Sequence, residues 1–170
     1  MVAILKNTIE KANRIVSECG TRDPAKIAQQ YGILIKTVAW DEQSGAYIEM
    51  LRQPVIFVAQ RLHSVTRSIV ISHELGHHFL HRKEATKLGG FREFKIFDMT
   101  NSRMEYEANV FAAQLMLPDD ETLEYIYQGY DVAEIAARMN SDINLVALKV
   151  SHLNNHGFNF REQEYRNRFY

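Results

Sequence analysis

The sequence predicts an α+β fold in which a small antiparallel or mixed sheet lies beside longer helices. Two observations support this prediction. Three short segments with the pattern of strands fall between residues 33 and 59, and the longest helical segments come later in the chain. The chain has 170 residues, 46% hydrophobic and 24% charged, as in an ordinary globular domain. We therefore expect a single domain over residues 1–170.

Two helices are predicted before the sheet. Residues 3–18 form the first of them. Asp23 followed by Pro24 is the pattern of an N-cap and a first helical residue, and it predicts a second helix that runs through Gln30. Gly32 then ends this helix, because glycine readily leaves the helical conformation.

The three predicted strands follow directly. Residues 33–40 alternate in polarity and form the first strand, and residues 46–51 form the second after a turn. Residues 52–54 make a bend into the third strand, 55–59. Proline cannot donate a hydrogen bond within a sheet, so Pro54 at a strand start indicates an exposed sheet edge, without fixing which strand forms it.

A long helix is predicted after the sheet. Ser64 can serve as its N-cap, and residues 65–81 contain no proline. Its one glycine, Gly76, costs about 0.5–1 kcal/mol relative to alanine, so a packing reason is expected. A bare Cα there would let another backbone, or a substrate, approach the helix closely.

The same helix contains the pentapeptide His73-Glu74-Leu75-Gly76-His77, an H-E-x-x-H motif. Its spacing places both histidines on one helical face, one turn apart, where both can reach a single Zn²⁺. Glu74 then lies beside the metal, where it can act as the general base that takes a proton from water. A buried helix that is merely rich in histidine is the alternative interpretation.

A catalytic zinc site needs a third protein ligand. His81 continues the series of histidines, but eight residues of helix rise about 12 Å, which is too far for ligands of one ion. The metzincin pattern also fails, because Leu80 and Lys83 stand where it needs glycine and histidine. The third ligand must therefore come from another segment.

Residues 104–117, closed by Pro118, form the helix most suited to supply that ligand. Glu105 shares a face with small and apolar residues that should pack inward, and a buried carboxylate there needs a cation. Glu107 falls almost opposite and is interpreted as a solvated helix charge. Asn109 can accept a hydrogen bond from a ligating histidine, or it is an ordinary asparagine of the helix surface.

These residues resemble a known family. The segment H-E-L-G-H-H-F-L-H, followed about 28 residues later by E-Y-E-A-N-V-F-A-A-Q-L-M-L-P, is similar to the ImmA/IrrE metallo-endopeptidases, which are small gluzincin-type zinc proteases. In gluzincins the third ligand opens an E-x-x-A-D/N pattern, which falls here on Glu105, Ala108 and Asn109. The resemblance extends upstream to residues 31–33, 45–48 and 55–59 and becomes weak after about residue 153.

The resemblance implies a zincin-like domain, with a short three-stranded sheet packed on the H-E-x-x-H helix and a mainly helical C-terminal half. It implies Zn²⁺ as the cofactor and, as protein substrate, a DNA-binding repressor of the helix-turn-helix class. Cleavage or inactivation of such a repressor would derepress genes of a mobile element or a stress response. The residues themselves do not identify this substrate.

Composition limits the other functional classes. The net charge of −1 gives no basic footprint for nucleic acid, so no direct contact with it is expected. Cys19 is the single cysteine, which excludes an internal disulfide and fits a reducing compartment. No signal-peptide pattern or apolar stretch of about 18 residues occurs. We expect a cytoplasmic protein without membrane contact.

Residues 131–140 and 141–150 form a predicted helical pair whose rhythm is that of a DNA-binding helix-turn-helix. A recognition helix needs polar and basic residues for bases and phosphates, but the second helix offers only Asn144 and Lys149. We interpret the pair as a packing element, with a DNA-binding regulator as a rival hypothesis.

The single domain divides into four predicted regions. Residues 1–63 hold the first helices and the sheet, 64–118 the metal-site helices, 119–153 the helical pair, and 154–170 a tail that is docked or loose. Between the metal-site helices, residues 82–102 form a solvated connector or a mildly basic loop over the cleft.

Zinc-dependent hydrolysis of a peptide bond is the function that the sequence favours. His73, His77 and Glu105 are the predicted metal ligands, and Glu74 is the predicted general base. His63, Tyr47, Tyr106 and the tyrosines later in the chain are open candidates for a donor to the oxyanion. The alternative is a zinc-containing antirepressor or toxin–antitoxin partner that binds its target without cutting it.

Overall fold

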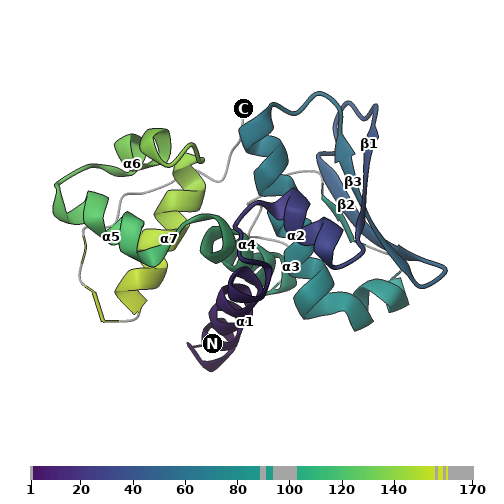
Figure 1. The fold of residues 1–170 in the computed structure, drawn as a ribbon, viewed down its shortest axis with the longest axis horizontal. Coiled ribbons are helices and arrows are strands. Elements are labelled where there is room, and N and C mark those ends of the chain that lie inside the picture. The colour runs from purple at the N-terminus through teal and green to yellow at the C-terminus, as the bar shows by residue number, and fades with distance from the viewer. Residues whose placement is uncertain (1, 89–90, 94–102, 156, 159, 161–170) are drawn as a thin grey trace.

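The computed structural model describes residues 2–88, 91–93, 103–155, 157–158 and 160 (Figure 1). Its helices are α1 (Val2–Cys19), α2 (Pro24–Gln30), α3 (Ser64–Leu88), α4 (Arg103–Met116), α5 (Asp119–Tyr127), α6 (Val132–Arg138) and α7 (Ile143–Asn155). Its strands are β1 (Leu34–Val38), β2 (Gly45–Met50), β3 (Gln53–Ala59) and β4 (Phe91–Glu93). The α+β class and the three predicted strands are confirmed.

The first turns of the chain follow the predicted signals. The Asp23 side chain accepts hydrogen bonds from the backbone N–H groups of Ala25 and Lys26, which caps α2. After α2, Gly32 has a φ of +67°, in the left-handed region that favours glycine. These local signals place α2 and β1 where the sequence predicts them.

The strands form one mixed sheet in the order β1-β3-β2-β4. β1 is parallel to β3, whereas β2 is antiparallel to both of its neighbours. β4 was not predicted, because it has only three residues and shows no periodicity of its own. It lies within the predicted connector 82–102 and pairs with the first half of β2.

Pro54 is the second residue of β3, which is internal to the sheet, so the edge that this proline indicated is not at β3. Pairing between β1 and β3 begins at Val55, so Pro54 lies one residue before that ladder and its missing N–H removes no bond to β1. The predicted bend at 52–54 is also shifted. Leu51 and Arg52 form the two-residue hairpin loop, with φ values of 51° and 67°.

Helix α3 is the central element of the fold. It begins at Ser64, which was predicted as the N-cap just before the helix, and it continues beyond the predicted end at 81 to Leu88, past a residue with non-helical angles at His81 (φ −125°, ψ 21°). Every residue from 69 to 78 is buried. Burial all round the helix arises because β2 and β3 pack on one side of α3 and α4 packs on another.

Figure 1 shows the sheet and α5–α7 at opposite ends of the molecule, with α1, α3 and α4 between them. Helix α1 packs on α4, and α2 packs on α3 and β1. One cluster of buried apolar side chains extends from α1 through the sheet and α3 to α7. The metal-site helices therefore lie in the middle of a continuous core.

The C-terminal part contains α5 in addition to the predicted helical pair. Asp119, Asp120 and Glu121 occupy its first turn, where negative charge is stabilised by the helix dipole. In α7 all residues from 144 to 150 are buried, so the second helix of the pair is a core element. Its two polar candidates for nucleic-acid contact, Asn144 and Lys149, are both buried.

Buried polar contacts connect α7 and the N-terminal segment to the C-terminal end of α4. Lys149 Nζ donates to Asp119 Oδ1 and, over 2.5 Å, to Gln114 Oε1. Arg22 Nη1 donates to the carbonyl oxygens of Gln114 and Leu115, each over 2.9 Å. The two Arg22 bonds satisfy backbone carbonyl groups that the end of α4 leaves without partners within the helix.

The tail begins against α7. Asn154 Nδ2 donates to the Phe160 carbonyl over 2.8 Å, and the Phe160 N–H donates to Asn154 Oδ1 over 2.7 Å. The remainder of the predicted tail, residues 161–170, lies outside the described residues, as do 89–90 and 94–102 of the predicted connector. Among the described helices, none has the length and apolar character needed to cross a membrane.

Candidate metal centre

Three predicted ligands from two helices meet at one point. His73 and His77 come from α3 and Glu105 from the first turn of α4, and one ligand atom of each lies within 4.8 Å of the others. The two imidazole Nε2 atoms are 3.0 Å apart, and Glu105 Oε2 is 3.1 Å from His73 Nε2 and 3.3 Å from His77 Nε2. Ligands at about 2.0–2.1 Å from a tetrahedral Zn²⁺ are separated by about 3.3 Å, so these spacings fit such an ion.

The second nitrogen of His73 has a fixed partner. Its Nδ1 lies 2.9 Å from Asn109 Oδ1, which is a buried contact. Because a carbonyl oxygen only accepts, His73 carries its proton on Nδ1 and presents a lone pair at Nε2. Asn109 therefore lies where it can accept a hydrogen bond from a histidine of the cluster, as predicted.

The interpretation of Glu107 as a solvated charge is wrong. Glu107 is 9% exposed, and its Oε2 lies 3.0 Å from His81 Nε2 while Arg103 Nε donates to its Oε1 over 2.6 Å. His81 is not part of the three-residue cluster, as its spacing along the helix predicts, but its Nδ1 lies 3.3 Å from Nδ1 of His77. Both residues thus belong to the surroundings of the site.

The positions of both glutamates follow from how α4 meets α3. Ala108 faces Gly76, and at about 100° per residue Glu105 lies on one flank of Ala108 and Glu107 on the other. The flank with Glu105 reaches His73 and His77, and the flank with Glu107 reaches His81. Helix α4 thus runs across α3, so Glu107 on one flank is buried and Glu105 on the other, with 18% of its side chain exposed, is partly buried.

Gly76 makes this crossing possible. A Cβ on Gly76 would lie 2.9 Å from Ala108 Cα and 3.1 Å from the Ala108 carbonyl oxygen. Of the two partners predicted for the bare Cα, the backbone of another helix is the one observed. The glycine of the motif and the alanine of the E-x-x-A-N segment are the contact point of the two helices.

Glu74 is completely buried and faces β2, the strand that packs on α3. A Cβ on Gly45 would lie 2.6 Å from Glu74 Oε1 and 2.5 Å from Val70 Cγ1, so the first residue of β2 leaves room for the carboxylate. Local sequence could not identify Gly45 as a site residue, because the contact joins segments 29 positions apart.

The electrostatics of the cluster favour a bound cation. Burial lowers the pKa of His77 to about 4, so its imidazole is neutral at pH 7. Neutral imidazoles and a carboxylate therefore bring lone pairs and negative charge to one point, which is a suitable donor set for a divalent metal.

The open candidates for an oxyanion donor are placed as follows. Tyr47 is buried with its hydroxyl 3.0 Å from His78 Nδ1, and burial raises its pKa to about 12. Tyr106 is half-buried on α4, and His63 is exposed before α3. Arg82, at the start of the predicted basic connector, donates two hydrogen bonds of 2.8 Å to the carboxylate of Glu49.

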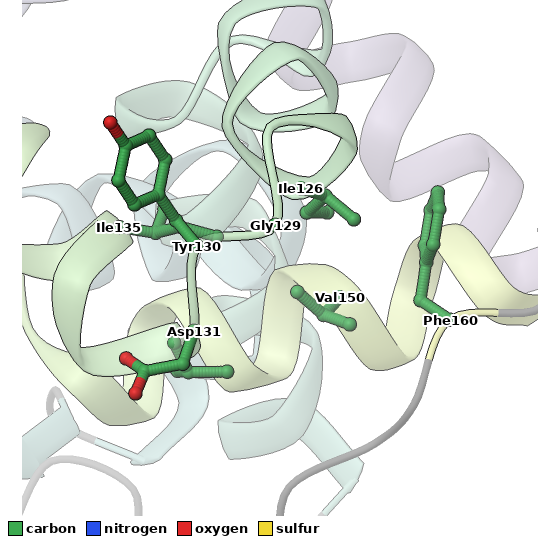
Figure 2. Close-up of a pocket in the computed structure, with 8 residues that line it drawn as sticks. Ile126, Gly129, Tyr130, Asp131, Ile135, Val150 and Phe160 are labelled. Carbon is green, nitrogen blue, oxygen red and sulfur yellow. The ribbon is translucent and has the colours of Figure 1, made fainter.

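A separate cavity of about 310 Å³ lies among α5, α6 and α7 (Figure 2). Figure 2 shows Val150, Ile126 and Phe160 along one part of it, with the Tyr130 hydroxyl directed away. Asp131 is among its lining residues, and the carboxylate of Asp131 already accepts the N–H of Glu134 in the capping box of α6. No residue of the three-ligand cluster lines this cavity.

Comparison with known proteins agrees with the geometry of the cluster. Residues 28–151 match the model of the peptidase M78 family, described as the IrrE N-terminal-like domain. The chain is 31% identical over 139 residues to "Uncharacterized immunity region protein 2" of Bacillus phage phi105, which covers 80% of this chain and 84% of that protein. It is also 34% identical over 90 residues to "Metallopeptidase ImmA" of Bacillus subtilis strain 168, which covers 51% of this chain and 50% of that protein.

The family match spans most of the chain, including both helices of the cluster and the strand that contacts Glu74. The family is one of metal-dependent peptidases, in agreement with the convergence of His73, His77 and Glu105. The resemblance to this family is thereby confirmed, and the chain belongs to the ImmA/IrrE family of metallopeptidases.

Proposed function

We propose that this protein is a zinc-dependent endopeptidase of the gluzincin type. The observation that supports it most is the triangle of ligand atoms from His73, His77 and Glu105, whose sides match a tetrahedral zinc site. When bound there, Zn²⁺ would supply Lewis acidity to a water molecule and to the carbonyl of the scissile peptide.

The chain's own residues have distinct roles in this proposal. His73, His77 and Glu105 hold the ion, and Asn109 keeps the His73 ring in the tautomer that offers Nε2. Glu74 takes a proton from the attacking water and later gives it to the leaving amine. Its burial against Gly45 restricts the positions open to its carboxylate, which favours a fixed line of proton transfer.

The sheet offers a surface for an extended substrate. Among the described strands, β4 is the edge on the β2 side, and its Glu93 pairs with Gly45, the residue beside Glu74. A peptide that adds to an edge strand forms backbone hydrogen bonds along it, and this edge would lead it past Glu74. We therefore propose β4 as the strand that aligns the substrate.

We further propose that the substrate is a regulatory protein, a repressor of the helix-turn-helix class, and that cleavage occurs in the cytoplasm. The name of the phi105 relative refers to an immunity region, and this association supports a role as an anti-repressor of a mobile element. The single cysteine, which permits no internal disulfide, fits the reducing compartment in which such a repressor works.

Two other functions compete with this proposal. A non-cleaving antirepressor or toxin–antitoxin partner would use zinc only to hold its fold, but that use does not require the buried carboxylate of Glu74. A DNA-binding regulator would need an exposed recognition helix, whereas Asn144 and Lys149 of α7 are buried.

The test compares the wild-type chain with Glu74→Gln on a helix-turn-helix repressor encoded beside it. We expect repressor fragments with the wild type and none with Glu74→Gln, although both bind one equivalent of zinc by elemental analysis. Equal loss of repressor activity without fragments from either protein would contradict the peptidase and favour the non-cleaving partner. A salt-sensitive shift of duplex DNA by the purified chain would favour the DNA-binding regulator.

A further inference from the structure

The two histidines of the cluster are held differently at their second nitrogens. Nδ1 of His73 donates directly to the side-chain amide oxygen of Asn109, Oδ1. Nδ1 of His77 instead meets Nδ1 of a third histidine, His81, over 3.3 Å, and Nε2 of His81 meets Oε2 of Glu107 over 3.0 Å. His77 is therefore connected to a carboxylate through an intervening imidazole.

Hydrogen-bonding rules assign the protons along this chain of contacts. The Glu107 carboxylate, which also accepts from Arg103, accepts from Nε2–H of His81. With one proton, on Nε2, the His81 ring has a lone pair at Nδ1, which can only accept, so the proton between the two rings belongs to Nδ1 of His77. Nε2 of His77, the atom that faces His73 and Glu105, is left with its lone pair.

We propose that His81 and Glu107 are positioning residues that fix the tautomer and ring orientation of His77, so that its Nε2 is ready for the metal. This inference rests on the proposed metal site but concerns residues outside the ligand set. His81 and Glu107 are 5% and 9% exposed, so water competes little with either hydrogen bond. Through these two hydrogen bonds, the buried carboxylate of Glu107 also makes Nε2 of His77 a better electron donor.

The non-helical angles at His81 support the assignment. At this point α3 departs from regular geometry, and the His81 ring lies between His77 and Glu107 instead of in solvent. Glu107 is in turn held from outside by Arg103, whose side chain is 67% exposed. The contacts thus run from the cluster to the molecular surface through α3 and α4 in turn.

The test measures zinc affinity by competition with a chromophoric chelator and needs no substrate. His81→Phe fills the space without an acceptor, and Glu107→Leu removes the carboxylate; we expect each to weaken zinc binding by about 10–100-fold. His81→Asn and Glu107→Gln, which each retain an acceptor oxygen, are expected to recover most of the affinity. His78→Phe is the matched control, because His78 is also a buried imidazole but bonds to Tyr47, and its zinc affinity should equal that of the wild type.

A second measurement keeps the proposal testable if the apolar variants fail to fold. Long-range ¹⁵N–¹H spectra of the zinc-loaded wild type should show the proton of His77 on Nδ1 and that of His81 on Nε2. A His81 proton on Nδ1, or wild-type zinc affinity in a folded His81→Phe, would overturn the positioning role alone. A wild-type chain that binds no zinc would overturn the proposed function and this inference together.

Discussion

Gly76 of α3 lies against the backbone of Ala108 in α4, so closely that a Cβ on Gly76 would come within 2.9 Å of the Ala108 Cα. The crossing point of the metal-site helices is therefore a glycine in contact with main chain. Because His73, His77 and Glu105 all lie within one turn of this contact, the separation of the two helices sets the geometry of the ligands.

Gly76→Ala is expected to push the helices apart. The gain in helix propensity is about 1 kcal/mol, whereas overpacking against backbone costs about 1–3 kcal/mol, so we expect a small net loss in the free energy of unfolding. Zinc affinity should fall more clearly, because the ligands on the two helices separate. Chemical denaturation and chelator competition measure the two effects.

Ala108→Gly provides the control for this prediction. The nearest atoms to the added methyl group are the Cα and the carbonyl oxygen of Ala108, which a glycine retains. The double variant Gly76→Ala/Ala108→Gly should therefore remain impaired. Full recovery of zinc affinity in the double variant would show that the side chain of Ala108, and not its backbone, limits the approach.

Gly45→Ala is expected to impair catalysis more than metal binding. The added methyl group would lie 2.6 Å from Glu74 Oε1 and would displace the carboxylate, while the ligand atoms come from other elements. A misplaced general base costs about 10²-fold in rate, so kcat should fall by that order at unchanged zinc content. Adding Val70→Ala removes the other close contact, at 2.5 Å, and should not restore kcat.

Removal of the metal is expected to lower thermal stability. A ligand that binds only the folded chain stabilises it by about 4 kcal/mol when its free concentration is about 1,000 times its Kd. Excess chelator should therefore lower the Tm of the wild type, and Glu105→Ala should have a low Tm that chelator hardly changes. A Glu105→Ala variant with full zinc content, beside a Glu107→Ala variant without zinc, would contradict the assigned ligand.

The ion pair of Asp119 and Lys149 should make stability depend on pH in the acid range. Burial alone would raise the pKa of Asp119, but its hydrogen bond with Lys149 lowers it below the ordinary value of 3.8. The unfolded chain then binds the proton more readily, so this contribution is complete above about pH 4 and is lost as the pH falls through the lower, folded pKa. Denaturation curves at several pH values should show a shallower acid dependence in Asp119→Asn.

At neutral pH the two partners of this pair should differ. The Lys149 side chain is 2% exposed and that of Asp119 is 48% exposed. Asp119→Ala leaves a charge buried and should cost roughly 1–3 kcal/mol, whereas Lys149→Met leaves a carboxylate that water can reach and should cost less. A larger loss in Lys149→Met would contradict this account.

Local signals in the sequence were sufficient for most of the fold. Asp23 and Pro24 fix a helix start through their own backbone and side-chain chemistry, and the histidine spacing fixes a face of α3. Glu105 and Asn109 were identified because the small residues around them share one face of α4. These features depend on neighbours within about one helical turn.

The features that the sequence did not yield depend on contacts between distant segments. The burial of Glu107 follows from the direction in which α4 crosses α3, which no periodicity within α4 encodes. The internal position of β3, the strand that contains Pro54, depends on where β1 begins to pair. The role of Gly45 in making room for Glu74 likewise appears only when β2 is packed on α3.

The anchoring of α4 at its C-terminal end, through Arg22 and Lys149, has a consequence for the length of this helix. Gln114 is held in place by both residues, and only four positions separate it from Asn109, which contacts His73. One residue inserted or deleted in that interval would turn the ligand-bearing half by about 100° relative to its anchor. The number of residues between Asn109 and Gln114 is thus as strict a requirement of the site as the identity of its ligands, and insertions or deletions in this interval should be tolerated less than substitutions.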